Sequence, residues 1–174
     1  MSLFESFDSF DTATQPVVTY PPLLECLPTL RLSDVGLNLT DDMFHGKYRG
    51  RTTHEDDLSL VLQRARSCGL ESALCTATDP AEAGRTFALI RTHQQRPLWL
   101  QTTVGVHPSH CREFARGVGV VKDTLRRLVY DGVSEGLVSA LGEMGLDYDR
   151  LHRCPKDLQL VGFEAQLQLA RELA

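Results

Sequence analysis

Apolar residues follow two alternating spacings along this chain, and the alternation predicts four strand–helix units. Dense or every-second-residue apolar runs are typical of strands, and apolar residues three and four apart indicate helices. Strands are predicted at 32–39, 71–77 and 98–106 and within 137–146. A helical pattern follows each of them, so the predicted order is strand, helix, four times over.

The first predicted helix has a signal at each end. Thr52 and Glu55 fit a capping box, with Thr52 at the N-cap. Gly69 is placed to close the helix, because glycine accepts the left-handed conformation that often follows the last turn. The apolar positions between these signals are Leu58, Val61, Leu62 and Ala65.

Prolines open two of the later helices. Asp79-Pro80 is typical of a helix start, with aspartate at the N-cap and proline at the first helical position. Pro155 can open a fourth helix. The stripes expected to face the core are Ala83, Phe87 and Ile90 in the second helix, Val121, Leu125, Leu128 and Val129 in the third, and Leu160, Phe163, Leu167 and Ala170 in the fourth.

Strands that alternate with helices predict an α/β protein with a parallel sheet and right-handed crossovers. A closed (β/α)₈ barrel usually needs about 250 residues, so four units predict the first half of a TIM-like barrel. A complete, open four-stranded sheet is the competing architecture. We expect this domain to cover 31–174, without a C-terminal half.

The segment 1–30 differs from the rest of the chain. It contains four of the eight prolines and no lysine, arginine or glycine. It has no sustained helical or strand period. We therefore predict an irregular N-terminal extension.

The composition limits the classes of protein to which this chain can belong. The 174 residues carry a formal charge of −5, which argues against a basic surface that coats nucleic acid. Bound divalent cations could still supply positive charge in a nuclease. Five scattered cysteines without a CxxC pair indicate reduced thiols and a cytoplasmic or nuclear location. We expect no membrane association, because no apolar run approaches the roughly 20 residues of a membrane span.

Two short motifs each place one polar side chain at the end of a predicted strand. Val104–Pro108 delivers His107, and Leu141–Tyr148 delivers Glu143. The carboxyl ends of parallel strands form the edge where α/β proteins build their active sites. Glu143 could bind Mg²⁺ or Mn²⁺ as an oxygen ligand, or it could be a structural carboxylate bonded to loop amides.

His107 and Asn38 are candidate substrate-binding residues, each with a structural alternative. His107 could contact a phosphate or orient a metal-bound water, or it could bond only to neighbouring backbone. Asn38 and Thr40, at the end of the first strand, could bind phosphate oxygens or cap the following loop.

A small basic cluster follows the first strand. Lys47, Arg49 and Arg51 surround Tyr48. Cationic and aromatic side chains together can hold a single-stranded end by charge and stacking. The alternative is an ordinary solvated loop. Lys47 and Arg49 are the substrate-binding candidates here.

The stretch from Asp34 to Phe163 resembles the N-terminal half of the TatD family of metal-dependent deoxyribonucleases. Four blocks in the family's order carry the resemblance: Asp34–Thr40, Phe44–Gly50 followed by His54 and Asp56-Asp57, Val104–Pro108 and Leu141–Asp147. Many relatives have a His-x-His pair on the first strand, where this sequence has Gly36 and Asn38, as in the branch nearest TatD itself.

The resemblance implies a TIM-like barrel that hydrolyses DNA phosphodiester bonds, at single strands or 3′ ends, with a divalent metal. The metal implied is Mg²⁺ first, with Mn²⁺ or Zn²⁺ as alternatives. Glu143 matches the position of a glutamate metal ligand. The other ligands, two histidines and an aspartate, belong to later strands that this sequence does not contain. We therefore expect little or no activity from 1–174 alone.

Two other functions stay open. The chain could be a non-catalytic half-barrel or truncated isoform that associates with another chain, for example as a homodimer through its open sheet edges. It could also be an amidohydrolase-like metal enzyme that acts on a small molecule. The sequence contains no GxxxxGK phosphate loop, which argues against ATP chemistry. It also shows no evident Ser-His-Asp or Cys-His arrangement for nucleophilic catalysis.

Overall fold

The computed structural model describes 31–94 and 98–174. The predicted irregular extension, 1–30, lies outside these residues.

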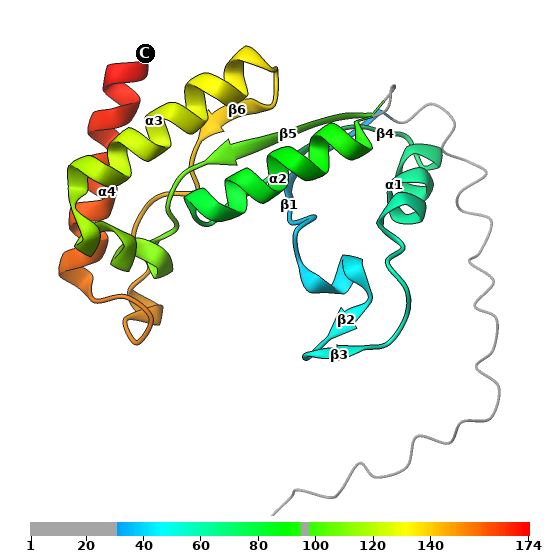
Figure 1. Cartoon of the computed structure of the whole chain (residues 1–174), viewed down its shortest axis with the longest axis horizontal. Coiled ribbons are helices and arrows are strands. Elements are labelled where there is room, and N and C mark those ends of the chain that lie inside the picture. The colour runs from blue at the N-terminus through cyan, green and yellow to red at the C-terminus, as the bar shows by residue number, and fades with distance from the viewer. Residues whose placement is uncertain (1–30, 95–97) are drawn as a thin grey trace, which may run out of the picture.

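Four parallel strands form the main sheet (Figure 1). They are β1 (Leu32–Leu37), β4 (Leu70–Cys75), β5 (Trp99–Val104) and β6 (Val138–Leu141). Their order in the sheet, β1-β4-β5-β6, follows the order of the chain. Doubly wound sheets reverse their strand order at a switch point, whereas barrels add strands in sequence. The predicted parallel βα repeats are therefore confirmed, in the order that a half-barrel requires.

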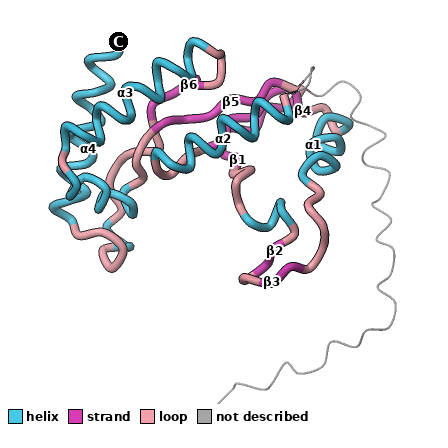
Figure 2. Tube along the Cα trace, in the orientation of Figure 1, coloured by secondary structure: helices cyan, strands magenta, loops and turns pink. Residues whose placement is uncertain are grey.

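Helices alternate with these strands (Figure 2). They are α1 (Leu58–Ser67), α2 (Pro80–His93), α3 (Val118–Ser134) and α4 (Lys156–Leu173). Shorter elements lie in the loops: the 3₁₀ segments η2 (Asp42–His45), η3 (Pro108–Arg116) and η4 (Tyr148–Arg150), and an antiparallel hairpin of β2 (Lys47–Tyr48) and β3 (Arg51–Thr52).

Two of the predicted helix boundaries are confirmed. The Asp79 side chain accepts a hydrogen bond of 2.8 Å from the Glu82 backbone N–H, and Pro80 is the first residue of α2. Gly69 has a φ of 93° directly after Cys68, the C-cap of α1. Glycine adopts this angle without the steric cost of a side chain.

The predicted capping box at Thr52 is wrong, because α1 begins at Leu58. Thr52 belongs to β3, and the Thr53 N–H donates to the Gly46 carbonyl at 2.8 Å, which ties the hairpin back to η2. The Asp56 carboxylate accepts from the Leu58 N–H at 3.1 Å. The hairpin thus uses the residues that the sequence pattern assigned to the helix start.

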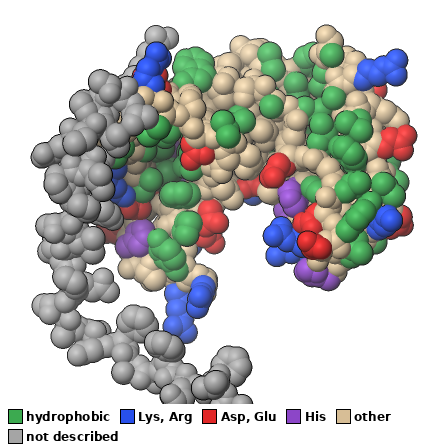
Figure 3. Space-filling model, turned by 180° about the vertical axis from the view of Figure 1, so that it is seen from behind, with side chains coloured by type: hydrophobic (Ala, Val, Ile, Leu, Met, Phe, Trp, Pro, Cys, Tyr) green, Lys and Arg blue, Asp and Glu red, His purple; other side chains and the backbone are tan. Residues whose placement is uncertain are grey.

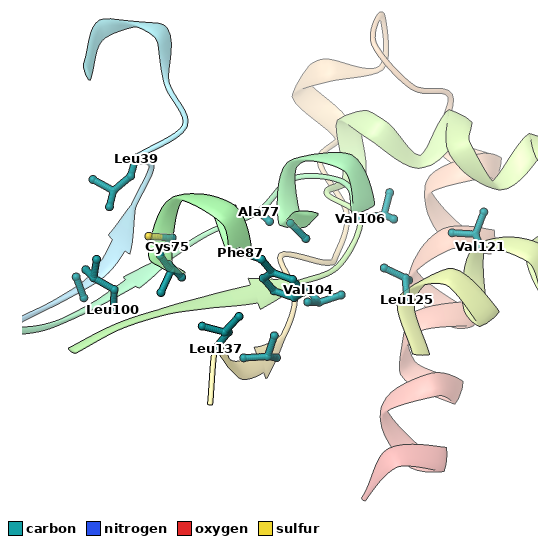
Figure 4. Packing of buried hydrophobic residues seen from close by; sticks show 14 of the residues in the cluster. Leu39, Cys75, Ala77, Phe87, Leu100, Val104, Val106, Val121, Leu125 and Leu137 are labelled. Atoms are coloured by element: carbon teal, nitrogen blue, oxygen red, sulfur yellow. The ribbon is translucent and has the colours of Figure 1, made fainter. Parts of the chain in front are cut away.

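The core lies between the sheet and the helices (Figure 4). Leu100 and Val104 of β5 are fully buried, and the predicted α2 stripe of Ala83, Phe87 and Ile90 is buried as well. Along α3, Val121 and Leu125 are buried, and this helix packs against α4 as well as β6. The strands and helices therefore enclose one continuous apolar cluster.

The predicted buried face of α4 is wrong. Leu160 and Leu167 are 45% and 47% exposed. The buried residues of α4 are Gln159, Gly162, Ala165, Gln166 and Leu169. The reason is η3, which the sequence pattern did not predict and which packs closely on α4. A Cβ atom on Gly162 would lie 2.6 Å from the Cys111 sulfur, so a small residue is needed at this contact.

Within the described residues, neither outer edge of the main sheet pairs with a further strand. β1 and β6 are the outer strands, and Val35 in β1 is 74% exposed. Ser139 and Ala140 in β6 are exposed too. None of the helices within 31–94 and 98–174 has the length and apolar composition needed to cross a membrane.

Candidate functional site

Two glycines bring the loops after β5 and β6 side by side. A Cβ atom on Gly105 would lie 2.5 Å from the Gly142 carbonyl carbon, which is closer than side chains tolerate. The Gly142 N–H donates to the Val104 carbonyl at 2.9 Å, and Gly142 has a φ of 151°. His107 and Glu143 therefore follow two backbone segments that lie next to each other, as the two motifs predict.

His107 and Glu143 line one hollow of about 390 Å³. The remaining lining comes from the same two loops: Pro108, Met144, Gly145, Leu146 and Asp147. Seen from behind, this edge of the molecule is hollowed between two lobes (Figure 3). The β2–β3 hairpin, with Lys and Arg at its tip, forms one lobe, and the other carries His, acidic and basic side chains.

The Glu143 carboxylate is exposed and makes no hydrogen bond or ion pair within 31–94 and 98–174. The structural alternative, a carboxylate bonded to loop amides, is thus not seen among these residues. Because the Glu143 side chain faces solvent, its negative charge has no desolvation penalty to offset. The carboxylate oxygens are available to a ligand that enters the hollow.

His107 is held through its ring Nδ1, and its Nε2 has no hydrogen-bond partner in the part of the chain that the structure describes. Its Nδ1 accepts the Ser109 backbone N–H at 3.1 Å and lies 2.8 Å from Ser109 Oγ, so His107 is the N-cap of η3. Burial lowers the pKa of His107; the negative charge of Glu143 opposes this effect and His110 adds to it. The neutral ring then carries its proton on Nε2, because Nδ1 is the acceptor.

Hydrogen bonds join the loops after β1, β4 and β5. Glu82, at the start of α2, is 7% exposed, and Thr40 Oγ1 lies 2.5 Å from its Oε1. The Thr78 N–H donates to Glu82 Oε2 at 2.8 Å. The Thr78 carbonyl in turn accepts the His107 N–H at 2.8 Å. A buried carboxylate that the sequence did not single out thus holds the loops that carry Asn38 and His107.

Asn38, Lys47 and Arg49 lie apart from the hollow. Asn38 is exposed after β1, and its Oδ1 is 2.9 Å from Thr40 Oγ1. Its carbonyl accepts the Asp41 N–H at 3.3 Å, which agrees with the loop-capping alternative. Lys47 and Arg49 are exposed on the hairpin and make no ion pair with any described residue.

Tyr48 is 43% exposed on the same hairpin. Its ring centroid lies 5.6 Å from that of His54, at an interplanar angle of 53°. An aromatic face and unpaired cations on one projecting hairpin form a surface suited to a flexible anionic strand.

Sequence reasoning also missed two buried glutamines of α4, Gln159 and Gln166, each with no exposed surface. Their spacing of two helical turns places them on one face, which is the only signal that the sequence offers. Glutamine on a helix usually faces solvent, so this spacing alone does not indicate a buried role.

The described residues hold no group of three or more His, Cys, Asp or Glu side chains placed to bind a metal ion. Glu143 is therefore not part of a complete set of metal ligands within the described residues.

A family model described as TatD related DNase matches 34–174. The chain belongs to the TatD-related DNase family. The resemblance that the four sequence blocks indicate is thereby confirmed.

Curated proteins similar to this TatD-family chain include nucleases of fungi and bacteria. The deoxyribonuclease Tat-D of Schizosaccharomyces pombe is 36% identical over 145 residues, which cover 82% of this chain and 45% of that protein. The 3′-5′ ssDNA/RNA exonuclease TatD of Erwinia amylovora is 36% identical over 141 residues, which cover 81% and 46%.

Two solved structures share the fold. A TatD family hydrolase of Entamoeba histolytica matches with a TM-score of 0.75 and 34% identity, over 82% of this chain and 46% of that one. An uncharacterised amidohydrolase of Saccharomyces cerevisiae matches with a TM-score of 0.70 and 35% identity, over 81% and 44%. The chain thus spans about half the length of the relatives it matches. The predicted fold class, the first half of a TIM-like barrel, is confirmed for the described residues.

Proposed function

We propose that this chain provides part of a metal-dependent site that hydrolyses phosphodiester bonds in DNA. The proposal depends on one observation: Glu143 and His107 follow neighbouring strands and line the same hollow. Membership in the TatD-related DNase family supports this chemistry. Relatives named as deoxyribonuclease and as ssDNA/RNA exonuclease support a nucleic-acid substrate.

Glu143 is the proposed metal ligand. Its exposed and unpaired carboxylate suits a hard divalent cation, Mg²⁺ first, with Mn²⁺ or Zn²⁺ as alternatives. A bound divalent metal would lower the pKa of a water and polarise the scissile phosphate. The further ligands that such an ion needs would come from groups other than the described residues.

His107, Asn38, Lys47 and Arg49 are the proposed substrate-binding residues. The Nε2–H of neutral His107 can donate to a phosphate oxygen in the hollow. Lys47 and Arg49 can hold the backbone of a single strand by charge, with Tyr48 as a stacking surface. The projecting hairpin and the open hollow together suit a single-stranded substrate or a 3′ end.

A second candidate function is a half-barrel that associates with another copy of the chain. Two observations favour it: β1 and β6 each have one edge that pairs with no described strand, and Val35 is 74% exposed. The small-molecule amidohydrolase hypothesis has no comparable support in the site. The proposed domain, 31–174, and a cytoplasmic or nuclear location remain predictions.

Manganese binding tests the proposed metal ligand directly. Paramagnetic Mn²⁺ added to the isotope-labelled chain is expected to broaden the amide signals of Gly142, Glu143 and His107 before others. Glu143→Gln should abolish this selective broadening, because an amide is a much weaker ligand. Glu164→Gln, an exposed position on α4, is the matched control and should leave it unchanged. Broadening that survives Glu143→Gln would refute the metal assignment.

Nuclease activity is the second test. Purified 1–174 is incubated with single-stranded DNA and Mg²⁺ or Mn²⁺, beside Glu143→Gln. We expect little or no cleavage. Cleavage that the variant loses would mean that the chain completes a site, for example as an oligomer. Cleavage that the variant retains would place the activity elsewhere.

A further inference from the structure

Helix α4 carries two buried amide side chains on the face that looks toward the candidate site. Gln159 and Gln166 have no exposed surface, although glutamine is seldom fully buried. Burying an amide is costly unless its donors and acceptor are bonded. The hydrogen-bond partners of these two side chains should therefore explain why both are buried.

Gln166 binds the backbone immediately before His107. The Val106 N–H donates to Gln166 Oε1 at 2.7 Å, and Gln166 Nε2 donates to the Val106 carbonyl at 3.0 Å. The second Nε2 hydrogen bonds the Gly162 carbonyl at 3.1 Å. One side chain thus satisfies both backbone groups of Val106, which lies beyond the end of β5.

Gln159 repeats this arrangement in the loop after β6. The Asp147 N–H donates to Gln159 Oε1 at 2.7 Å, and Gln159 Nε2 donates to the carbonyls of Asp147 and Cys154, each at 2.9 Å. Both amide hydrogens are again used. Asp147 lies beyond the end of β6 and lines the hollow together with Glu143.

The two contacts join the loops of the candidate site to one rigid element. We propose that Gln159 and Gln166 are positioning residues, which fix the Asp147 and Val106 backbones to α4 and thereby set how the Glu143 and His107 loops face each other. The proposal rests on the proposed function only in taking the hollow as the reaction site. Neither glutamine touches the hollow, so both act through the loops that they hold.

A merely structural role would have a different signature. Two glutamines that only stabilise α4 would, when replaced, speed the opening of the whole helix and of the core packed on it. Two local clamps would each release one loop and leave the other in place. Amide hydrogen exchange resolves these cases residue by residue.

The experiment compares Gln166→Met and Gln159→Met with the unchanged chain. Methionine keeps the length of the side chain and removes its amide. In Gln166→Met, exchange at Val106 should rise about tenfold or more while exchange at Asp147 stays unchanged; Gln159→Met should do the reverse. Gln168→Met is the matched control, because Gln168 is exposed on the same helix and its side chain bonds just one described residue, donating to Glu164 Oε1 at 3.3 Å.

Three results would overturn the proposal. One is a uniform rise in exchange at Val106, Asp147 and the core amides in either variant. Another is no change at the clamped amide. The third needs no variant: in the unchanged chain, Val106 and Asp147 should exchange as slowly as β5 amides although they lie outside strands, and exchange as fast as in solvated loops would exclude the clamps.

Mn²⁺ broadening separates this inference from the proposed function. If the unchanged chain binds Mn²⁺ at Glu143, Gln159→Met should weaken that binding several-fold while Gln168→Met does not. If the unchanged chain shows no selective broadening, the proposed metal role fails, and the crossed exchange pattern still decides whether the glutamines position the two loops.

Discussion

The carboxylate of Glu82 shows how a single buried charge organises the site edge. Burial by itself raises the pKa of Glu82, but hydrogen bonds from Thr40 and Thr78, together with Arg85, outweigh it and hold the pKa below its ordinary value of 4.5. The position at the start of α2 adds to this effect, because a helix N-terminus favours negative charge. The charged form therefore stabilises the folded chain.

Replacing Glu82 by glutamine should reveal this stabilisation as a function of pH. A folded pKa below the unfolded one gives stability that is present above about pH 4.5 and lost as the pH falls through the folded pKa. We expect Glu82→Gln to lower the free energy of unfolding by about 1–3 kcal/mol at pH 7, with a smaller difference at low pH. Urea unfolding at pH 7 and pH 4 measures both. Equal differences at the two pH values would contradict this account.

At the scale of elements, η3 determines which face of α4 is buried. Leu169 has no exposed surface, whereas Leu167 is 47% exposed. Leu169→Ala should cost about 2–5 kcal/mol of unfolding free energy, and Leu167→Ala about 0.5 kcal/mol or less. The two variants make the same chemical change on one helix, so each controls for the other in a urea titration. Equal losses would mean that the predicted apolar stripe is buried after all.

The β2–β3 hairpin is the element expected to hold a nucleic-acid strand. Lys47→Ala and Arg49→Ala should each weaken binding of a single-stranded oligonucleotide. Each should also reduce the salt slope of the logarithm of the binding constant by about 0.7 for every phosphate that the side chain neutralises. Fluorescence anisotropy at several salt concentrations measures both quantities. Arg127→Ala, on the exposed side of α3, is the control. A slope that falls as much in the control would show that the hairpin has no special role.

At the scale of the whole molecule, the outer strands β1 and β6 pair with no further strand among the described residues, and Val35 in β1 is strongly exposed. Parallel edges with free backbone groups favour pairing with another chain. We expect a fraction of the 19.4 kDa chain to dimerise, with a mass near twice this value by size exclusion with light scattering. Val35→Lys should shift it to monomer, because a charge opposes burial at that edge. A strict monomer at high concentration would argue against the half-barrel dimer.

The sequence by itself predicted what depends on near neighbours in the chain. The start of α2 at Asp79-Pro80, the end of α1 at Gly69 and the alternation of strands and helices are local signals. Parallel order then places His107 and Glu143 at one edge, because both follow strands that end on the same side of the sheet. The resemblance carried by the four motif blocks rests on the same local patterns.

Only the tertiary structure decided the contacts between distant segments. Thr40 meets Glu82 across 42 positions of the chain, and Gln166 meets Val106 across 60. Gly162 of α4 likewise packs against Cys111 of η3, far away in the sequence. This contact buries a face of α4 other than the predicted apolar stripe. A polar side chain is buried only where folding brings it a partner, and the identity of that partner is not encoded in its neighbours. For this reason the sequence predicted the edge where the candidate site lies, while the fold determined which residues hold its loops in place.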